Sequence, residues 1–399
     1  MSTLKVDAIR HNSATSDAIT MATDGTCTAN ITGMIGGGVF SHKNIAINGA
    51  MQVAQRGSST TITASNNSSI SGYYTVDRMK LSAYVGSERY TLSQETDAPT
   101  GSGFNKSFKI KTSTADTSAN AGTYASFTYR IEGQDLQQLL KGTSSAKPLT
   151  ISFWCKGNTN YTPVAELKDN TNVRINVQTF NVTTSWTKVT LTYVGDTTGG
   201  TIDNDHSAGL SLNIWLKAAA AYSGGTSPAQ NTWVAQSNQN IRAALLTFDI
   251  GASTDNYFQI TGLQIEVGDV ATPFEFRSFG DELRRCMRYY ERTYPYGVAL
   301  GGSNSFAGMI NQTGSSNGTG TMVVPIQYGV EKRVAPTLTA YNANNGNSGT
   351  WYVLRNGASG HNSVTIDQSS TRRARLYFSV GANWVVAAAE GHFIADAEL

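Results

Sequence analysis

Two short stretches decide the fold class of this chain. Residues 149–155 are Leu-Thr-Ile-Ser-Phe-Trp-Cys, and residues 210–216 are Leu-Ser-Leu-Asn-Ile-Trp-Leu. In both, apolar side chains alternate with Thr, Ser, Asn or Trp, which is typical of an antiparallel β-strand with one face on a core. Residues 186–193 show the same alternation. We therefore predict a jelly-roll-like sandwich of two antiparallel sheets whose inner faces form the core.

The composition of the 399-residue chain agrees with an all-β class. Charged residues make up 15% of the sequence, and 39 residues are glycine. A soluble domain averages ~25% charged residues. Ser, Thr and Asn, which favour turns and strand surfaces over helices, take much of the remaining share. The formal net charge is only +2, so we expect no electrostatic attraction to nucleic acid or anionic lipid.

The cysteines and the first residues indicate where the protein is made. Cys27, Cys155 and Cys286 are odd in number and far apart, which is typical of free thiols in a reducing cytoplasm. The opening residues Met-Ser-Thr-Leu-Lys-Val-Asp lack the apolar segment of a signal peptide. No stretch approaches the ~18 consecutive apolar residues of a membrane span. We expect cytoplasmic synthesis and no membrane insertion.

The chain divides into four regions. Residues 1–38 hold too few large apolar residues for a core of their own and end in three glycines. We therefore expect an extended segment that packs on another chain or on copies of itself. Residues 39–277 contain the recurring strand signals of the sandwich. Residues 278–292 predict a short connector helix. Residues 293–399 return to strand signals and predict a small C-terminal β domain, called the tip domain below.

The connector helix has the clearest helical pattern in the sequence. Ser278 is in position to cap its N-terminus, and acidic residues follow in the first turn. Apolar side chains recur at helical spacing and form one stripe. The stripe consists of Phe279, Leu283, Cys286 with Met287, and Tyr290. We expect this stripe to be buried against the sandwich or against neighbouring chains.

Three parts of the sequence resemble tail fibre proteins of tailed bacteriophages, especially marine and cyanobacterial ones. The first is similar to the N-terminal segment of those fibres, the second to the entry of their sandwich module, and the third to its exit. The parts are residues 2–9 with 19–29, residues 44–57 with 74–78, and residues 260–277 with 284–291. The resemblance implies a homotrimer that is part of the virion tail.

The same resemblance implies two kinds of partner. The N-terminal segment, through Leu4, Val6 and Ile9, is expected to dock to tail adaptor or nozzle proteins. The remainder is expected to bind a polysaccharide or an outer-membrane protein on the host surface. The alternatives are a purely structural connector or decoration protein without a receptor site, and a tailspike that depolymerises glycans.

Aromatic residues beside amides and hydroxyls are the candidate glycan contacts, because a sugar ring has an apolar C–H face and polar edges. We expect receptor contacts in the Gly-, Asn- and Ser-rich loops 302–320, 342–349 and 356–363 of the tip domain. The candidates there are Tyr341, Asn344, Asn345, Trp351 and Tyr352. A competing hypothesis puts the site on the sandwich, at Trp154, Trp215 and Trp233, with Tyr73, Tyr74 and Tyr222 as further stacking candidates. These tryptophans also suit packing under a loop or against a neighbouring chain.

Neither a cofactor nor a catalytic centre is expected. Asp203 and Asp205 lie in a Gly-rich loop that has oxygen ligands for Ca²⁺, but their spacing fits no EF-hand and favours a solvated turn. Motifs of phosphate loops, zinc proteases and serine hydrolases are absent from the sequence. A glycosidase needs only two suitably spaced carboxylates, so such a pair stays open at this stage. We expect a protein that is not an enzyme.

Overall fold

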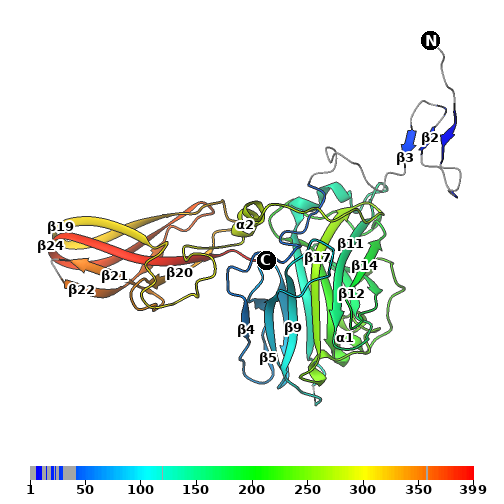
Figure 1. Ribbon diagram of the computed structural model, residues 1–399, viewed down its shortest axis with the longest axis horizontal. Helices are drawn as coiled ribbons and strands as arrows, with labels where there is room; N and C mark the ends of the chain where they lie inside the picture. The colour runs from blue at the N-terminus through cyan, green and yellow to red at the C-terminus, as the bar shows by residue number, and fades with distance from the viewer. Residues whose placement is uncertain are drawn as a thin grey trace, which may run out of the picture.

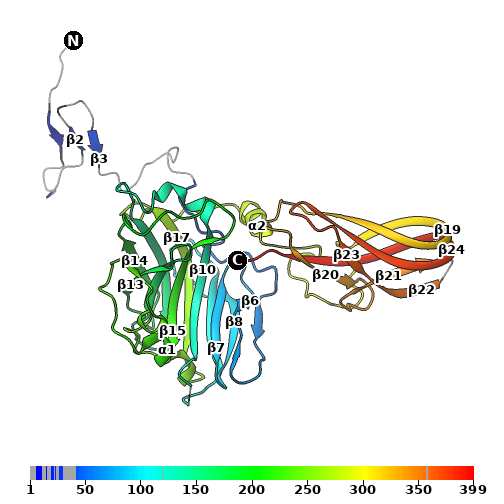
Figure 2. The same ribbon diagram turned by 180° about the vertical axis from the view of Figure 1, so that it is seen from behind.

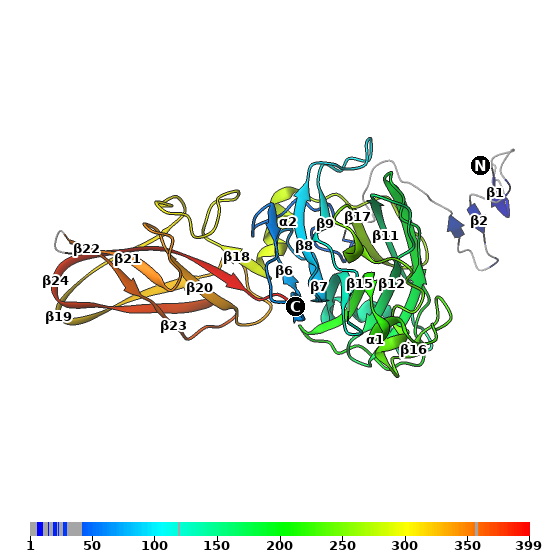
Figure 3. The ribbon, with the colours of Figure 1, turned by 90° about the horizontal axis from the view of Figure 1, so that it is seen from below.

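The computed structural model describes residues 6–10, 15, 19–21, 23, 27–29, 42–118, 120–355 and 358–399. Regular structure in this part of the chain is almost entirely β (Figure 1), which confirms the predicted all-β class. Two sheets pack face to face as a sandwich, and the tip domain extends from one side of it (Figures 1 and 3). None of the described helices is long and apolar enough to cross a membrane.

The sandwich consists of an eight-stranded and a six-stranded sheet, and every pairing within them is antiparallel. The eight-stranded sheet has the order β16 (Val234–Ala235), β13 (Arg174–Thr179), β12 (Val164–Asp169), β15 (Ala208–Ala218), β10 (Tyr124–Glu132), β7 (Lys80–Val85) and β5 (Ser68–Ser69), with β6 (Gly72–Tyr73) also paired to β7. The six-stranded sheet has the order β14 (Thr187–Tyr193), β11 (Leu149–Gly157), β17 (Tyr257–Val267), β9 (Ser107–Thr114), β8 (Arg89–Glu95) and β4 (Ser59–Thr61).

The alternation in the sequence sets which face of each strand is buried. On β11, Ile151 and Phe153 are fully buried, and on β15 Leu212 and Ile214 are fully buried. These side chains belong to one core between the two sheets. Because successive residues of a strand point to opposite faces, the intervening polar residues point away from this core. The predicted inward faces of β11 and β15 are therefore confirmed.

The tip domain is a single seven-stranded sheet with its own core, and β24 (Arg373–Asp396) is its central element. The strands paired directly with β24 are β18 (Tyr290–Arg292), β19 (Ile310–Gln327), β20 (Thr337–Asn342), β21 (Thr350–Arg355) and β23 (Thr365–Asp367), and β22 (Ala358–Ser363) pairs with β21. At the other end of the chain, β1 (Ala8–Ile9), β2 (Ile19–Met21) and β3 (Cys27–Ala29) form a small antiparallel sheet.

The connector helix is shorter than predicted and buries a different face. Helix α2 spans Phe279–Met287, and the chain continues as β18, because residues 290–292 pair with the end of β24. Ser278 caps the helix as expected. Phe279 is 42% exposed and Leu283 is only half-buried, whereas Glu282 and Cys286 are buried. Within one chain, therefore, the sandwich does not bury the first two members of the apolar stripe, and their burial against neighbouring chains stays a prediction.

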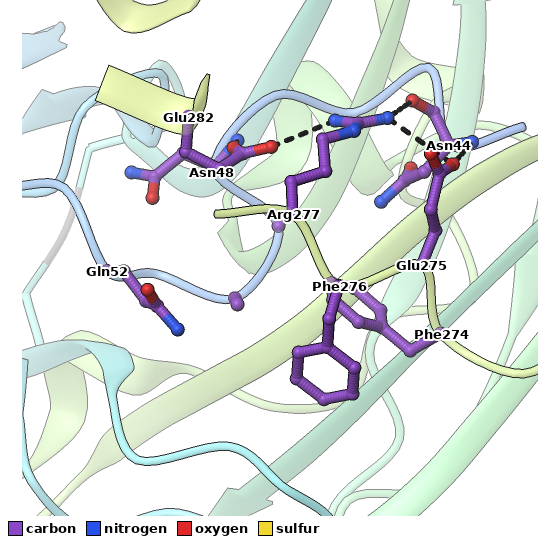
Figure 4. A pocket seen from close by; sticks show the side chains of 10 residues that line it. Asn44, Asn48, Gln52, Phe274, Glu275, Phe276, Arg277 and Glu282 are labelled. Carbon is purple, nitrogen blue, oxygen red and sulfur yellow. Dashed lines mark hydrogen bonds and ion pairs between the residues drawn. The ribbon is translucent and has the colours of Figure 1, made fainter. Parts of the chain in front are cut away.

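Polar contacts explain why Glu282 is on the buried face of α2. Its carboxylate accepts hydrogen bonds from the backbone of Asn48 and from the Arg277 guanidinium, the latter at 3.0 Å. Arg277 also donates to the carbonyl oxygen of Asn44 (Figure 4). It donates to the carbonyl oxygen of Ala46 at 3.1 Å as well. The hollow around these residues has a volume of about 10 Å³, room for about one water molecule. This hollow is therefore a packing feature of the helix and not a ligand site.

A buried ionic network joins the sandwich to the tip domain. Arg78 is 1% exposed, forms an ion pair with Glu398, and has its guanidinium 3.5 Å from the ring centre of Tyr289. Arg56 forms an ion pair with Glu398 at 3.4 Å and lies 3.7 Å from the ring centre of Tyr290. Both arginines belong to the sandwich, whereas Tyr289, Tyr290 and Glu398 belong to the segment that begins directly before β18.

The remaining short helices lie in connections of the sandwich. They are η1 (Gly133–Leu139), α1 (Ala220–Ser223), η2 (Gln239–Ile241) and η3 (Ile250–Ala252). Helix α1 follows β15 directly and lies at the end of that strand (Figure 2). Together with η2 it covers part of the outer face of the eight-stranded sheet, where a second, smaller core includes Val164, Ile175 and Trp215.

Candidate functional site

The outer face of the eight-stranded sheet has a polar surface built from matching rows of residues. Ser126 of β10 lies opposite Trp215 of β15, and two residues further along β10 Thr128 lies opposite Asn213. The next row places Arg130 opposite Ser211. Because alternate residues share one face of a strand, all of these side chains point outward, away from the apolar core.

Strand β12 extends two of these rows on the other side of β15. Asn213 lies opposite Glu166, and Ser211 lies opposite Lys168. Ser211 therefore lies between Arg130 and Lys168, which belong to the strands on either side of it. A row with two cations, Arg130 and Lys168, thus lies beside a row that consists of a hydroxyl, an amide and the Glu166 carboxylate.

This surface is hollowed into a groove with a volume of about 220 Å³. Its floor comes from β7, β10, β15 and β12, and its wall comes from α1 and the η2 segment. The lining residues are Ser82, Tyr124, Ser126, Arg130, Lys168, Asn170, Ser211, Asn213, Trp215, Tyr222, Gln239 and Arg242. The groove combines aromatic, hydroxyl, amide and cationic groups in one recess, which suits a polar ligand with apolar faces.

Three aromatic rings form one end of the groove. The ring centres of Tyr124 and Tyr222 are 4.7 Å apart, and those of Trp215 and Tyr222 are 5.3 Å apart. Trp215 is almost fully buried at 1% exposure, whereas both tyrosines are half-buried. The tyrosines therefore present ring surface to a ligand, and Trp215 supports them from below.

The buried carboxylate of Glu166 holds the groove residues in place. It accepts two hydrogen bonds from Arg242, at 2.6 and 2.8 Å. It also accepts one from the Asn213 amide and one from the Trp215 indole, both at 3.0 Å. Because its side chain is fully buried and has four charge-assisted or neutral donors, Glu166 fixes the orientation of three lining residues.

The cationic end of the groove has a different character. Burial lowers the pKa of the Lys168 ammonium below its ordinary value, and the guanidinium groups of Arg242 and Arg130 lower it further. The Nε atom of Arg130 is buried and has no hydrogen-bond partner. Because the charges of Arg130 and Lys168 repel each other, an anionic group between them would be favoured.

Of the three sandwich tryptophans predicted as glycan contacts, only Trp215 lies in the groove. Trp154 is half-buried on the outer face of the six-stranded sheet, in register with Lys188. Trp233 donates from its indole to the carbonyl of Val194 at 2.7 Å and packs partly against the main core. The structure therefore does not bring the three together.

The tip-domain candidates fall into a buried residue, a turn and a strand. Trp351 is fully buried in the tip core, so contrary to the prediction its ring has no free face for a sugar. Asn344 and Asn345 lie in one turn, where their backbone N–H groups donate to the side chain of Asn342. The other two candidates are half-buried: Tyr341 on β20, and Tyr352 on β21, where its ring lies 5.6 Å from the His361 ring.

The weaker predictions have local outcomes. The Asp205 carboxylate accepts hydrogen bonds from the backbone and side chain of Ser207, as in a solvated turn. Over the ranges that the structure describes, His, Cys, Asp and Glu form no group that suits a metal ion, Asp203 included. Of the expected tail-attachment residues, Ile9 is 49% exposed on β1, Val6 is half-buried, and Leu4 lies outside the described residues.

Sequence reasoning missed most of the groove. Arg130, Lys168 and Glu166 occupy the polar phase of β10 and β12, and the same alternation that identified β11 would have placed them outward. Tyr222 is among the aromatic residues that the sequence indicates as glycan contacts, whereas Arg242 comes from a segment without regular periodicity. Nothing in the sequence indicated that this segment folds over the outer face of the sheet.

Searches for related proteins give similar structures only. No family model and no curated protein matches the chain. The enzymatically active domain of tailspike protein 4 from bacteriophage CBA120 is similar over 56% of this chain and 21% of its own, at 13% identity and a TM-score of 0.27. A family 11 carbohydrate-binding module from Clostridium thermocellum is similar over 52% of this chain and 97% of its own, at 12% identity and a TM-score of 0.25.

A family 30 carbohydrate-binding module is also similar, over 55% of this chain and 93% of its own, at 10% identity and a TM-score of 0.26. The chain therefore spans about a fifth of the tailspike domain and nearly all of each binding module. TM-scores this low do not establish a common fold.

Proposed function

We propose that this protein binds a glycan in the groove of the eight-stranded sheet and acts as a receptor-binding tail fibre of a phage. The observation that carries the proposal is the juxtaposition of Tyr124 and Tyr222 with a floor of Ser126, Ser211 and Asn213. An apolar sugar face packs on the tyrosine rings, and the sugar hydroxyls exchange hydrogen bonds with the floor.

The floor is preorganised for such a ligand. Asn213 is held by Glu166, and Ser211 accepts a hydrogen bond from the Asn170 amide at 2.9 Å. Side chains that are fixed before binding lose little conformational entropy when the ligand arrives. The volume of about 220 Å³ is below the ~300–1,000 Å³ of pockets that enclose drug-sized ligands. The groove therefore suits a short section of a polysaccharide, with the rest of the polymer outside it.

The assignment to a virion rests on the sequence resemblance. Residues 44–57 and 260–277 resemble the entry and exit of the sandwich module in phage tail fibres. On this basis three copies of the chain form a homotrimer, whose N-terminal segments dock to tail proteins. Three grooves per trimer and several fibres per particle raise avidity by ~10²–10⁴ over a single weak contact.

Binding without bond cleavage is part of the proposal. Glycoside hydrolysis uses two carboxyl groups on either side of the scissile bond. The described residues that line the groove include no Asp or Glu, and the carboxylate below them, Glu166, is bound to Arg242. Release of reducing sugars from host polysaccharide by the purified protein would contradict this part.

The groove assignment is tested with polysaccharide extracted from cells that the phage infects. In affinity electrophoresis, we expect this polysaccharide to retard the purified full chain. The double variant with Tyr124→Ala and Tyr222→Ala should migrate without retardation. Trp154→Ala, on the opposite sheet, is the matched control and should bind as the unmodified protein does. The same proteins are then compared as blockers of phage adsorption.

The competing location is the tip domain. If Tyr341→Ala with Tyr352→Ala abolishes retardation and the groove variant retains it, the receptor site belongs to the tip. If neither pair of substitutions changes binding or adsorption blocking, the protein is better described as a structural component of the tail.

A further inference from the structure

We infer that the groove selects an acidic glycan, in which a carboxylate-bearing sugar occupies the end formed by Arg130 and Lys168. This inference rests on the proposed function and specifies the class of glycan. It depends on the charges and spacing at one end of the groove, which are separate from the aromatic end that supports glycan binding in general.

The balance of charge in the groove is positive. Arg130, Lys168 and Arg242 line it, and among the described residues the only carboxylate in contact with these three belongs to Glu166, which binds Arg242. The next carboxylate along β10 is that of Glu132, and it is bound to Arg288. Within the ranges that the structure describes, Arg130 and Lys168 form no ion pair.

Arg130 lies near two further cations, Lys80 and Arg78, and near the Glu398 carboxylate, which offsets part of their charge. Arg130 contributes to lowering the pKa of Lys80 to about 8, after the larger effect of burial. Arg78 donates to the backbone carbonyl of Arg130 at 2.7 Å, and its own charge is paired with Glu398. Like charges in a recess cost electrostatic energy in the free protein, and a bound anion recovers it.

The spacing of the two cations fits one oxyanion. Neighbouring strands lie ~4.8 Å apart, so the Cα atoms of Arg130 and Lys168 are ~10 Å apart across β15. The residue between them is Ser211, which lines the groove and whose hydroxyl accepts a hydrogen bond from the Asn170 amide at 2.9 Å. Long side chains from both sides therefore reach a common point above Ser211. A guanidinium binds a carboxylate through two parallel hydrogen bonds. Because the Nε atom of Arg130 is buried, the two Nη groups are the donors that we assign to this anion.

The distance between the two ends of the groove defines the ligand further. Ser211 and Trp215 are four residues apart on β15, which corresponds to ~13 Å along the strand. This is longer than one pyranose ring, so the carboxylate and the stacked sugar belong to different residues of the glycan chain. We therefore expect an acidic oligosaccharide to bind much more tightly than a free uronic acid.

The test compares one polysaccharide in two forms. Host polysaccharide is used as extracted and after chemical reduction of its carboxyl groups to alcohols, and binding is measured by affinity electrophoresis. We expect carboxyl reduction to weaken binding to the unmodified protein at least tenfold. Arg130→Gln and Lys168→Gln should each weaken binding to the native form by tenfold or more and change binding to the reduced form little.

Three controls make the result specific. Lys111→Gln removes one charge from the exposed outer face of the six-stranded sheet and should have no effect. Arg130→Lys keeps the positive charge but cannot donate two parallel hydrogen bonds, so we expect a loss of affinity between those of the unmodified protein and Arg130→Gln. If Arg130→Gln does not fold, Arg130→Lys is used in its place. Dextran sulfate tests whether sulfate esters substitute for carboxylates.

The outcomes separate this inference from the proposed function. Equal binding of native and carboxyl-reduced polysaccharide, or unchanged binding by Arg130→Gln and Lys168→Gln, overturns the inference. If Tyr124→Ala still abolishes binding in that case, glycan binding in the groove is retained. Binding to dextran sulfate that survives Tyr124→Ala would show a non-specific attraction to polyanions and would also overturn the inference.

Discussion

Replacement of Arg78 by methionine should strongly destabilise the protein, because Arg78 is the central cation of the junction between sandwich and tip. Its guanidinium contacts the Glu398 carboxylate and the Tyr289 ring, and it donates to the backbone carbonyl of Arg130. Arg78→Met removes all three contacts while it keeps an unbranched side chain of similar length. Glu398 then retains only Arg56, at 3.4 Å.

The magnitude follows from the burial of both partners. Arg78 is 1% exposed and the Glu398 side chain 6% exposed. Removing one partner of a buried ion pair costs ~3–5 kcal/mol. We take the lower figure, about 3 kcal/mol, because Arg56 partly compensates the charge of Glu398. For domains of ~150–250 residues, each kcal/mol shifts the Tm by ~2–4 °C, so the Tm should fall by roughly 6–12 °C.

The assay is differential scanning calorimetry together with urea unfolding of the full-length variants. The matched control is Arg372→Met, which breaks a 3.0 Å ion pair with Glu331 whose partners are 78% and 49% exposed. An exposed pair contributes ~0–1 kcal/mol, so this control should unfold almost as the unmodified protein does. A double-mutant cycle with Glu398→Gln then measures the coupling directly. If Arg78→Met lies within 1 kcal/mol of the control, or if the cycle is additive, the reasoning about the junction is refuted.

Three further predictions concern titration, the groove and the tip core. Burial raises the pKa of Asp77 from an ordinary 3.8 to about 6, so the stabilisation from its protonated form is complete below pH 3.8 and is lost as the pH rises through about 6. In urea unfolding, Asp77→Asn should therefore gain stability relative to the unmodified protein between pH 4 and pH 7. The same dependence of stability on pH in both proteins would contradict this. Glu166→Gln should lower the free energy of unfolding by ~3 kcal/mol in chemical denaturation, because Arg242 keeps its charge without a partner. The same variant should be retarded less by the glycan in affinity electrophoresis. A stability loss below 1 kcal/mol would mean that water replaces the carboxylate. Trp351→Ala should destabilise the tip domain by ~3–5 kcal/mol in calorimetry, because its ring is buried in the tip core. At a temperature where the variant is folded, it should still block phage adsorption. If the folded variant no longer blocks adsorption, Trp351 belongs to the receptor site after all.

The strands with alternating apolar and polar residues were predictable from the sequence, because this alternation directly indicates which side chains are buried. Trp215 is out of phase with Leu212 and Ile214, and it lies on the outer face as that phase requires. The same rule applied to β21 would have placed Trp351 in the tip core, since it is in phase with Val353, which is also buried. That prediction failed through an incomplete use of the pattern and not through a lack of signal.

Other features depend on contacts that no local pattern contains. The end of α2 is set by strand pairing with residues more than 100 positions away, as in the register of Tyr290 with Asp396. Glu166 is paired with Arg242, 76 residues along the chain. Such long-range pairs decide the groove and the junction, and a single sequence gives no access to them.

The junction also bears on how the tip domain can be exchanged. Tyr290, where the chain enters the tip, pairs with Asp396, where it leaves, so both ends of the domain lie side by side at the sandwich. Arg56 contacts both of these residues and Arg78 contacts Glu398. A foreign domain whose first and last strands pair with each other in the same way can therefore replace the tip domain between these two positions. The sandwich, with its groove, would keep its fold in the chimaera, so that different tip domains could be compared on one unchanged base.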